Sequence, residues 1–345
     1  MTTRPATHAG SWYTSSAPQL KAQLEGNLAA VKPIEALEYD PPVNGCKALI
    51  GPHAGYSYSG PAAAWAYAAI PVKKIKRVFL LGPSHHFYLS RIALSGCSKY
   101  ATPLGDIPLD METIAKLRKT GKFDEMDLET DGDEHSLEMH LPYLRLVFQH
   151  SPEMKLVPLL VGNVSETTTA EYAQVFQEYW ADEHTFWVIS SDFCHWGTRF
   201  SHTPYYPNPP PIPHPVPPTE TRSTATLATN VGPPEMITLS RTTPSRVLET
   251  PIWQSIQYMD HEAMDILREG GREGTGRAFR QYLKRTGNTI CGRNPISVLL
   301  AIMETAARAS GDTPAEIVFV RYEQSSRCET VRDSSVSYVS GLVII

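Results

Sequence analysis

Histidine, aspartate and cysteine side chains follow several apolar runs of this sequence, and these residue types hold metal ions or transfer protons. Three runs are followed in this way: KALIG (47–51) by His53, RVFLLG (77–82) by His85 and His86, and TFWVISS (185–191) by Asp192 and His195. Open α/β sheets form their ligand crevices at the carboxyl ends of their strands. We therefore expect these side chains to meet in one site.

A single histidine after a strand more often satisfies a backbone carbonyl than binds a ligand. The recurrence at three strand ends favours the site, because three independent accidents in one chain are improbable. Adjacent residues after a strand point apart, so we expect His85 to face inward and His86 to serve in hydrogen bonding.

Cys291 lies in the segment NTICGRNP (288–295), just before a helix predicted to begin at Asn294 and Pro295. The positive end of a helix dipole favours the thiolate over the thiol. A free cysteine is equally often a small buried apolar residue. The spacing alone does not decide between these two interpretations.

The segment DGDEHSLEMHLPYLRL (131–146) carries a second group of polar residues. His135 and Glu138 are three apart and would share a helix face, with His140 following before Pro142. A carboxylate that orients an imidazole is common beside metal sites. The acidic residues at the start of the segment are equally typical of a solvated helix start.

The elements that would position these residues alternate between strands and helices. Four near-continuous apolar runs are typical of strands buried on both faces: 47–51, 77–82, 155–162 and 185–191. Helices are predicted between and after them, at 61–70, 110–120, 168–180 and 295–309, with two last strands at 316–322 and 335–345. This order predicts one α/β domain over residues 1–345, with a buried mixed or parallel central sheet flanked by helices.

Composition narrows the classes of function. With 41% hydrophobic and 19% charged residues and a net charge of −5, the chain resembles an ordinary globular protein without a basic surface for nucleic acid or anionic membranes. No apolar run is long enough to span a membrane, and the first residues lack the apolar core of a secretory signal. The five cysteines show no CxxC pair, which argues against a disulfide framework. We expect a cytoplasmic location, with the nucleus as a second one.

Residues 203–251 differ from the rest of the chain because they are rich in proline, threonine and serine. Few large apolar residues are available there to drive burial, and proline disfavours helix. We expect a surface insertion that is disordered or polyproline-like. Its PxxP spacing at 203–218 would suit an SH3-type reader, although most proline-rich loops have none.

Seven motifs resemble, in order, those of the Memo family, which is named for mediating ErbB2-driven cell motility. They are THAGSWY (7–13), PHAGYSYSG (52–60), LGPSHH (81–86), DEHSLEMHLPY (133–143), SSDFCHWG (190–197), NTICGR (288–293) and DSSVSY (333–338). The resemblance spans the chain except for 203–251. The family is similar in fold to class III extradiol dioxygenases of the LigB type, which hold non-haem iron with two histidines and a carboxylate.

The resemblance implies a ligand set and a pocket. His53 and His85 match the metal histidines, Cys291 falls where the dioxygenases have their carboxylate, and Asp192 and His195 match catalytic pocket residues. The pocket rim, which would receive a peptide, is assigned to Trp12, Tyr58, His135, Glu138 and His140. Family members are described as binding copper or iron redox-actively and phosphotyrosine peptides.

Three functions are compatible with these residues. The first is a metal-binding redox protein with one copper or iron ion per chain, because two imidazoles and a thiolate are a soft ligand set that also accepts zinc. A thiolate is itself readily oxidised, which argues against ring-cleaving dioxygenase activity. The second is a non-enzymatic adaptor for phosphotyrosine or other acidic peptides, with a signalling role in motility or invasive growth. The third, a cysteine hydrolase using Cys291, His195 and Asp192, is disfavoured because the last two share one short loop.

Overall fold

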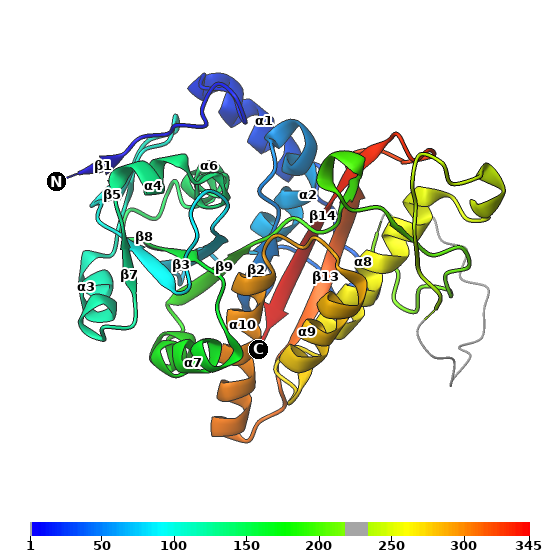
Figure 1. Cartoon of the computed structure of the whole chain (residues 1–345). Coiled ribbons are helices and arrows are strands. Elements are labelled where there is room, and N and C mark those ends of the chain that lie inside the picture. Colours follow the sequence, from blue (N-terminus) through cyan, green and yellow to red (C-terminus); the bar gives the residue numbers. More distant parts are fainter. Residues whose placement is uncertain (1, 218–233) are drawn as a thin grey trace.

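The apolar runs of the sequence form the middle of a mixed β-sheet (Figure 1). The computed structural model describes residues 2–217 and 234–345. Within these residues, eight strands follow one another across the sheet in the order β10 (His195–Gly197), β14 (Ser334–Ile344), β2 (Cys46–Gly51), β9 (Thr185–Ser190), β3 (Arg77–Pro83), β8 (Lys155–Val161), β4 (Ile92–Ser95) and β7 (Asp124–Met126). A further strand, β13 (Glu316–Gln324), pairs with β14. The predicted fold class, α/β with a mixed central sheet, is confirmed.

The centre of the sheet brings the predicted strand ends together. β2, β9 and β3 are parallel neighbours, with Gly51 opposite Ser190 and Leu81 opposite Ile189. Every residue of β2 and β9 is buried, as expected for strands covered on both faces. The segments after these three strands therefore start side by side at one end of the sheet.

Antiparallel strands complete the sheet on both sides of this parallel centre. β14 is antiparallel to β2, β10 and β13, and β4 is antiparallel to β8. Two small sheets lie outside it: β1 (Thr3–Arg4) with β5 (Lys99–Tyr100) and β6 (Ile107–Pro108), and β11 (Pro204–Tyr205) with β12 (Ile237–Thr238).

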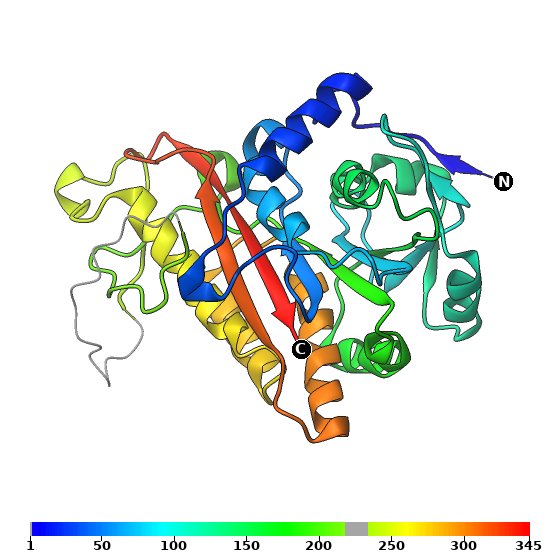
Figure 2. The same cartoon turned by 180° about the vertical axis from the view of Figure 1, so that it is seen from behind.

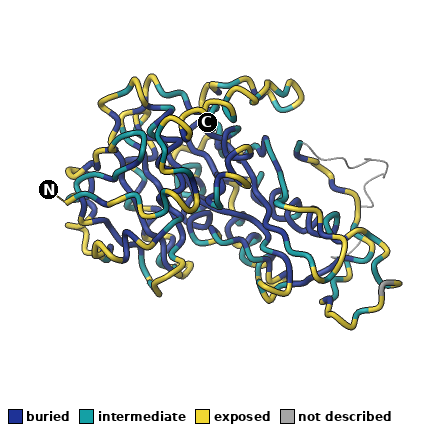
Figure 3. The backbone as a smooth tube through the Cα atoms, turned by 90° about the horizontal axis from the view of Figure 1, so that it is seen from above, coloured by how far each residue is buried: buried dark blue, intermediate teal, exposed yellow. Residues whose placement is uncertain are grey.

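Helices cover both faces of the sheet. Figures 1 and 2 show α7 (Glu166–Ala181), α8 (Ile252–Arg268), α9 (Thr275–Thr286) and α10 (Arg293–Ser310) on one face and α1 (Ala17–Ala29) and α2 (Tyr56–Ala68) on the other. The remaining helices are α3 (Met111–Lys119), α4 (Leu128–Asp133), α5 (His135–Glu138) and α6 (Leu141–Val147). In Figure 3 the buried residues follow the sheet and the inward sides of these helices.

Two predicted helix starts are too late, one by five residues and the other by two. α2 begins at Tyr56, with Gly55 as its N-cap, so that Pro61 lies inside the helix and not at its first turn. α10 begins at Arg293, with Gly292 and not Asn294 as its N-cap. In both cases the chain turns into the helix directly after the loop that carries a site residue.

Residues 203–251 are only partly a surface segment. The middle of the predicted disordered insertion, residues 218–233, lies outside the described residues. The described flanks are folded: β11 pairs with β12, and Tyr205, Tyr206 and Val216 are fully buried. The prediction is therefore corrected for the flanks, because their few aromatic and apolar side chains pack beside α8.

None of the helices in the described part of the chain combines the length and the apolar character of a membrane span.

Candidate metal centre

His53 follows β2 and is held in one orientation by β9. Its Nδ1 lies 2.6 Å from the Ser190 hydroxyl. That hydroxyl uses its only hydrogen to bond the Ser136 carbonyl oxygen, 2.8 Å away. It must therefore accept a hydrogen bond from Nδ1–H of His53. Nε2 is left with its lone pair, which is the form in which neutral imidazole binds metal. Burial lowers the pKa of His53 well below its ordinary value and keeps the ring neutral.

His85 follows β3 and is oriented by Glu134, the N-cap of α5. Its Nδ1 lies 2.9 Å from one Glu134 oxygen, and its backbone N–H donates to the other at 2.8 Å. Burial would raise the pKa of Glu134, but the hydrogen bonds from His85 and the nearby imidazoles lower it to about 2. A carboxylate bound to Nδ1 leaves the Nε2 lone pair of His85 free and more basic.

Gly292 lets the loop between α9 and α10 reach the end of β9. A Cβ on this residue would lie 2.3 Å from the Ser191 Cβ and 2.4 Å from the Ser190 carbonyl oxygen. Its N–H donates to the Ser191 hydroxyl at 3.1 Å. A side chain here would push the loop away, so glycine at this position allows Cys291 to enter the site.

The Cys291 sulfur lies in the pocket, 3.1 Å from His53 Nε2. The Asp192 backbone N–H donates to it at 3.1 Å. Burial and the Asp192 carboxylate raise the pKa of the thiol well above its ordinary value. Of the two interpretations that the sequence left open, this favours the neutral buried thiol just before the start of α10, because loss of water around sulfur outweighs the helix dipole.

Asp192 and His195 both lie beside this pocket. One Asp192 oxygen accepts the His53 backbone N–H at 2.9 Å, and the other lies 4.0 Å from His195 Nε2. Burial raises the pKa of Asp192 to about 7 and lowers that of His195 to about 4. The imidazole that contacts the Cys291 sulfur is that of His53, so the Cys–His–Asp line of the hydrolase hypothesis is not assembled.

His135 and Trp12 form the outer side of the pocket. The His135 ring stacks on His85 at 4.3 Å and on Trp12 at 4.4 Å between ring centroids. Trp12 is 36% exposed and His85 is also exposed, so this stack of rings borders the solvent. Burial lowers the pKa of His135 to about 3. These positions agree with a pocket rim, and peptide binding there stays a prediction.

Two other residues assigned to the rim lie in the interior instead. Glu138 is fully buried and bonded to Arg4, and His140 is fully buried with its Nδ1 2.6 Å from the Tyr67 hydroxyl. His135 and Glu138 do lie on one helical turn, α5, whereas His140 lies between the end of α5 and the start of α6 at Leu141. Tyr58 is exposed on α2.

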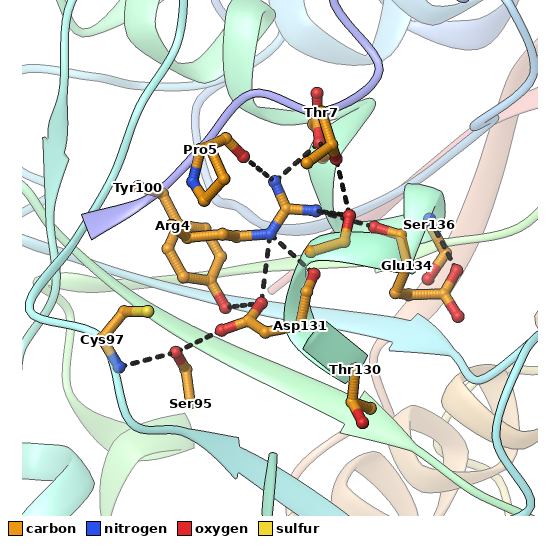
Figure 4. A network of polar contacts seen from close by, with 12 residues as sticks. Arg4, Pro5, Thr7, Ser95, Cys97, Tyr100, Thr130, Asp131, Glu134 and Ser136 are labelled. Carbon is orange, nitrogen blue, oxygen red and sulfur yellow. Dashed lines mark hydrogen bonds and ion pairs between the residues drawn. The ribbon is translucent and has the colours of Figure 1, made fainter. Parts of the chain in front are cut away.

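The N-terminal strand β1 fixes the segment from α4 to α5 that orients His85 (Figure 4). The Arg4 guanidinium is fully buried and pairs with Asp131 at 3.1 Å and Glu138 at 2.6 Å. It also donates to the carbonyl oxygens of Asp131 (2.8 Å), Gly132 (3.3 Å) and Glu134 (2.9 Å). These charged hydrogen bonds tie the segment from α4 to α5 to β1, and pulling the two apart would break them.

The ligands form two overlapping groups. One ring nitrogen each of His53, His85 and His135 lies within 4.8 Å of the others, and so do ligand atoms of His53, Asp192 and Cys291. The predicted ligands His53, His85 and Cys291 therefore fall into two groups: His53 belongs to both, His85 to the first and Cys291 to the second. The donors are nitrogen, sulfur and carboxylate oxygen, and this set fits a transition-metal ion.

Three supporting residues were missed by sequence reasoning: Ser190, Glu134 and Arg4. The position of Glu134, one residue before His135 at a helix start, is compatible with a carboxylate that orients an imidazole. It is equally typical of a solvated helix start, so the sequence does not decide its role. Ser190 and Arg4 had no such signal, since their partners lie far away in sequence.

This is an α/β protein that can hold a metal ion, because histidine, cysteine and carboxylate side chains gather at the ends of its central strands. A family model described as Memo-like protein matches residues 4–342. Protein MEMO1 of Homo sapiens is 39% identical over 344 residues, which cover 99% of this chain and 97% of the relative. Protein MEMO1 of Danio rerio is 39% identical over 346 residues (100% and 98%), and the memo-1 homolog of Caenorhabditis elegans is 37% identical over 343 residues (99% and 83%). The chain belongs to the Memo family.

Proposed function

We propose that this protein binds one copper or iron ion redox-actively through His53, His85 and Cys291 and signals in cell motility or invasive growth. The observation that carries the metal proposal is the 3.1 Å approach of the Cys291 sulfur to His53 Nε2, the nitrogen left with its lone pair. The signalling role rests on the family resemblance, and the lack of any disulfide among the five cysteines, all of them described, supports a cytoplasmic or nuclear location.

The pocket fits such an ion by the chemistry of its donors. Two imidazoles, each with Nδ1 already bound to an oxygen, present their Nε2 atoms, and one thiol adds sulfur. Sulfur and imidazole ligands suit copper and ferrous iron and also accept zinc. When bound, a redox-active ion would supply one-electron chemistry.

Asp192 and His195 would move protons in this pocket. Asp192 has a pKa of about 7, so it can both accept and release a proton near neutral pH. His195 Nε2 is buried without a hydrogen-bond partner among the described residues, and it faces Asp192. Transfer of a proton between the carboxylate and this imidazole would require a closer approach than the present 4.0 Å, or one bridging water.

Metal loading of the anaerobically purified protein tests the proposal. His53→Ala should weaken copper(I) and iron(II) binding by more than the roughly 10–100-fold typical of an outer-shell partner. The exposed His150→Ala is the matched control and should bind as the native chain does. X-ray absorption of the loaded native chain should show a metal–sulfur distance of about 2.3 Å. Unchanged affinity in His53→Ala, or no sulfur neighbour in the native chain, would overturn the assignment.

A second candidate function is the adaptor for phosphotyrosine or acidic peptides. The observation favouring it is the set of exposed aromatic side chains near the strand ends: Trp12, Tyr58, Phe87 and Tyr88. Titration with matched phosphorylated and unphosphorylated peptides would test it, with Trp12→Ala as the variant expected to weaken binding. Equal binding of both peptides would contradict it. An SH3-type reader of 203–218 remains a separate proposal, limited by the burial of Tyr205, Tyr206 and Val216.

A further inference from the structure

We propose that the pocket has a second position for its metal ion, formed by the three imidazoles of His53, His85 and His135, beside the position that uses Cys291. The inference rests on the proposed metal-binding function and adds one ligand, His135, and an alternative binding position for the ion. It follows because His53 belongs to both groups of possible ligands.

The geometry gives two ligand groups with one common member. The His53 ring lies 5.2 Å from the His85 ring and 5.4 Å from the His135 ring, centroid to centroid, and one ligand atom of each lies within 4.8 Å of the others. A ligand atom of His53 also lies within the same limit of ligand atoms of Asp192 and Cys291. His53 is therefore the member that the two groups share.

Only one nitrogen of His53 is free to bind. Nδ1 is bound to the Ser190 hydroxyl, so both ligand groups must use Nε2. One lone pair binds one ion at a time. The two positions are therefore alternatives for a single ion and not a two-metal site.

The contacts of the His135 ring fix its orientation before any metal ion binds. His135 stacks on His85 with an angle of 23° between the rings and on Trp12 with 30°, and its side chain is only 12% exposed. Its Nδ1 lies 3.5 Å from the Glu134 carboxylate, the same group that orients His85. A ring fixed in this way loses little conformational freedom on binding an ion.

The two positions differ in chemistry. The position that uses Cys291 offers sulfur, which favours soft ions. The three-imidazole position is all nitrogen and neutral, and suits copper(II) and zinc. An ion could therefore stay in the pocket when the thiol is removed or blocked.

Cobalt(II) titration of the full chain tests the proposal, because sulfur bound to cobalt gives a charge-transfer absorption band that nitrogen does not. The native chain should bind one ion with this band. Cys291→Ala should still bind one ion, without the band. Adding His135→Ala to Cys291→Ala should weaken binding by more than the roughly 10–100-fold expected of an outer-shell partner, whereas His135→Ala alone should leave the band in place.

His135→Phe separates ligation from packing, because it keeps a ring in the stack without a nitrogen. In the Cys291→Ala background it should weaken binding as much as His135→Ala. Unchanged affinity in either His135 variant of that background, or complete loss of binding in Cys291→Ala alone, would overturn the three-imidazole position. A native chain that binds no cobalt, or binds it without the sulfur band, would instead refute the proposed metal function.

Discussion

Replacing Arg4 with methionine should destabilise this protein strongly although Arg4 lies outside the central sheet. Methionine keeps much of the side-chain volume but removes the charge and every N–H donor. Two buried carboxylates, on Asp131 and Glu138, would then lose their cation, and four carbonyl oxygens would lose their donors.

The expected loss of stability follows from the burial of the two ion pairs that Arg4 makes. Both partners of each ion pair are at most 1% exposed, and breaking a buried pair by removing one partner costs about 3–5 kcal/mol, because an uncompensated charge remains. That is a large part of the roughly 5–15 kcal/mol by which a native protein is stable. Arg118→Met is the matched control, since Arg118 pairs with Glu125 on the surface and such pairs contribute about 0–1 kcal/mol.

Urea unfolding followed by fluorescence measures the free energy of unfolding of each chain. The chains compared are the native one, Arg4→Met, Arg118→Met and Glu138→Gln. Adding Glu138→Gln to Arg4→Met should recover part of the loss, because it removes the stranded carboxylate. The reasoning is refuted if Arg4→Met lowers the free energy of unfolding no more than Arg118→Met does. It is also refuted if the double variant loses as much stability as Arg4→Met and Glu138→Gln lose together as single variants.

Three further outcomes are expected. Burial would raise the pKa of Glu138, but hydrogen bonds and the charge of its partners lower it from 4.5 to about 2, so its stabilisation is complete above about pH 4.5 and lost as pH falls toward 2. Glu138→Gln should therefore remove about 2 kcal/mol of acid dependence from the unfolding free energy measured between pH 6 and pH 3, and an unchanged pH profile would contradict this. Ser190→Ala should weaken metal binding about 10–100-fold, because His53 loses its orienting partner, and should cost about 1–3 kcal/mol in urea unfolding, because buried polar groups lose their hydrogen bonds; equal affinity in a metal titration would argue against the assigned tautomer. Gly292→Ala should cost about 1–3 kcal/mol in urea unfolding and remove the metal–sulfur signal, since its Cβ would clash at 2.3 Å and displace Cys291; a native spectrum would exclude this role for the glycine.

The sequence alone determined the central strands and the residues at their carboxyl ends. Uninterrupted apolar runs such as 77–82 can only be strands or core helices, and the residues after them, His53, His85 and Asp192, are fixed by chain order. Because neighbouring parallel strands end together, the meeting of these side chains could be expected without coordinates. The family motifs pointed to Cys291 in the same way.

Only the tertiary structure decided which side chains orient the ligands. Ser190 accepts from His53 across 137 positions, and Arg4 reaches Glu138 across 134, so no local pattern marks either pair. The family resemblance placed Glu138 and His140 at the rim, but the packing of distant elements around them leaves both side chains in the interior. Periodicity reports which face of a single element is apolar, whereas the partner of a buried polar group is set by the packing of elements distant in the chain.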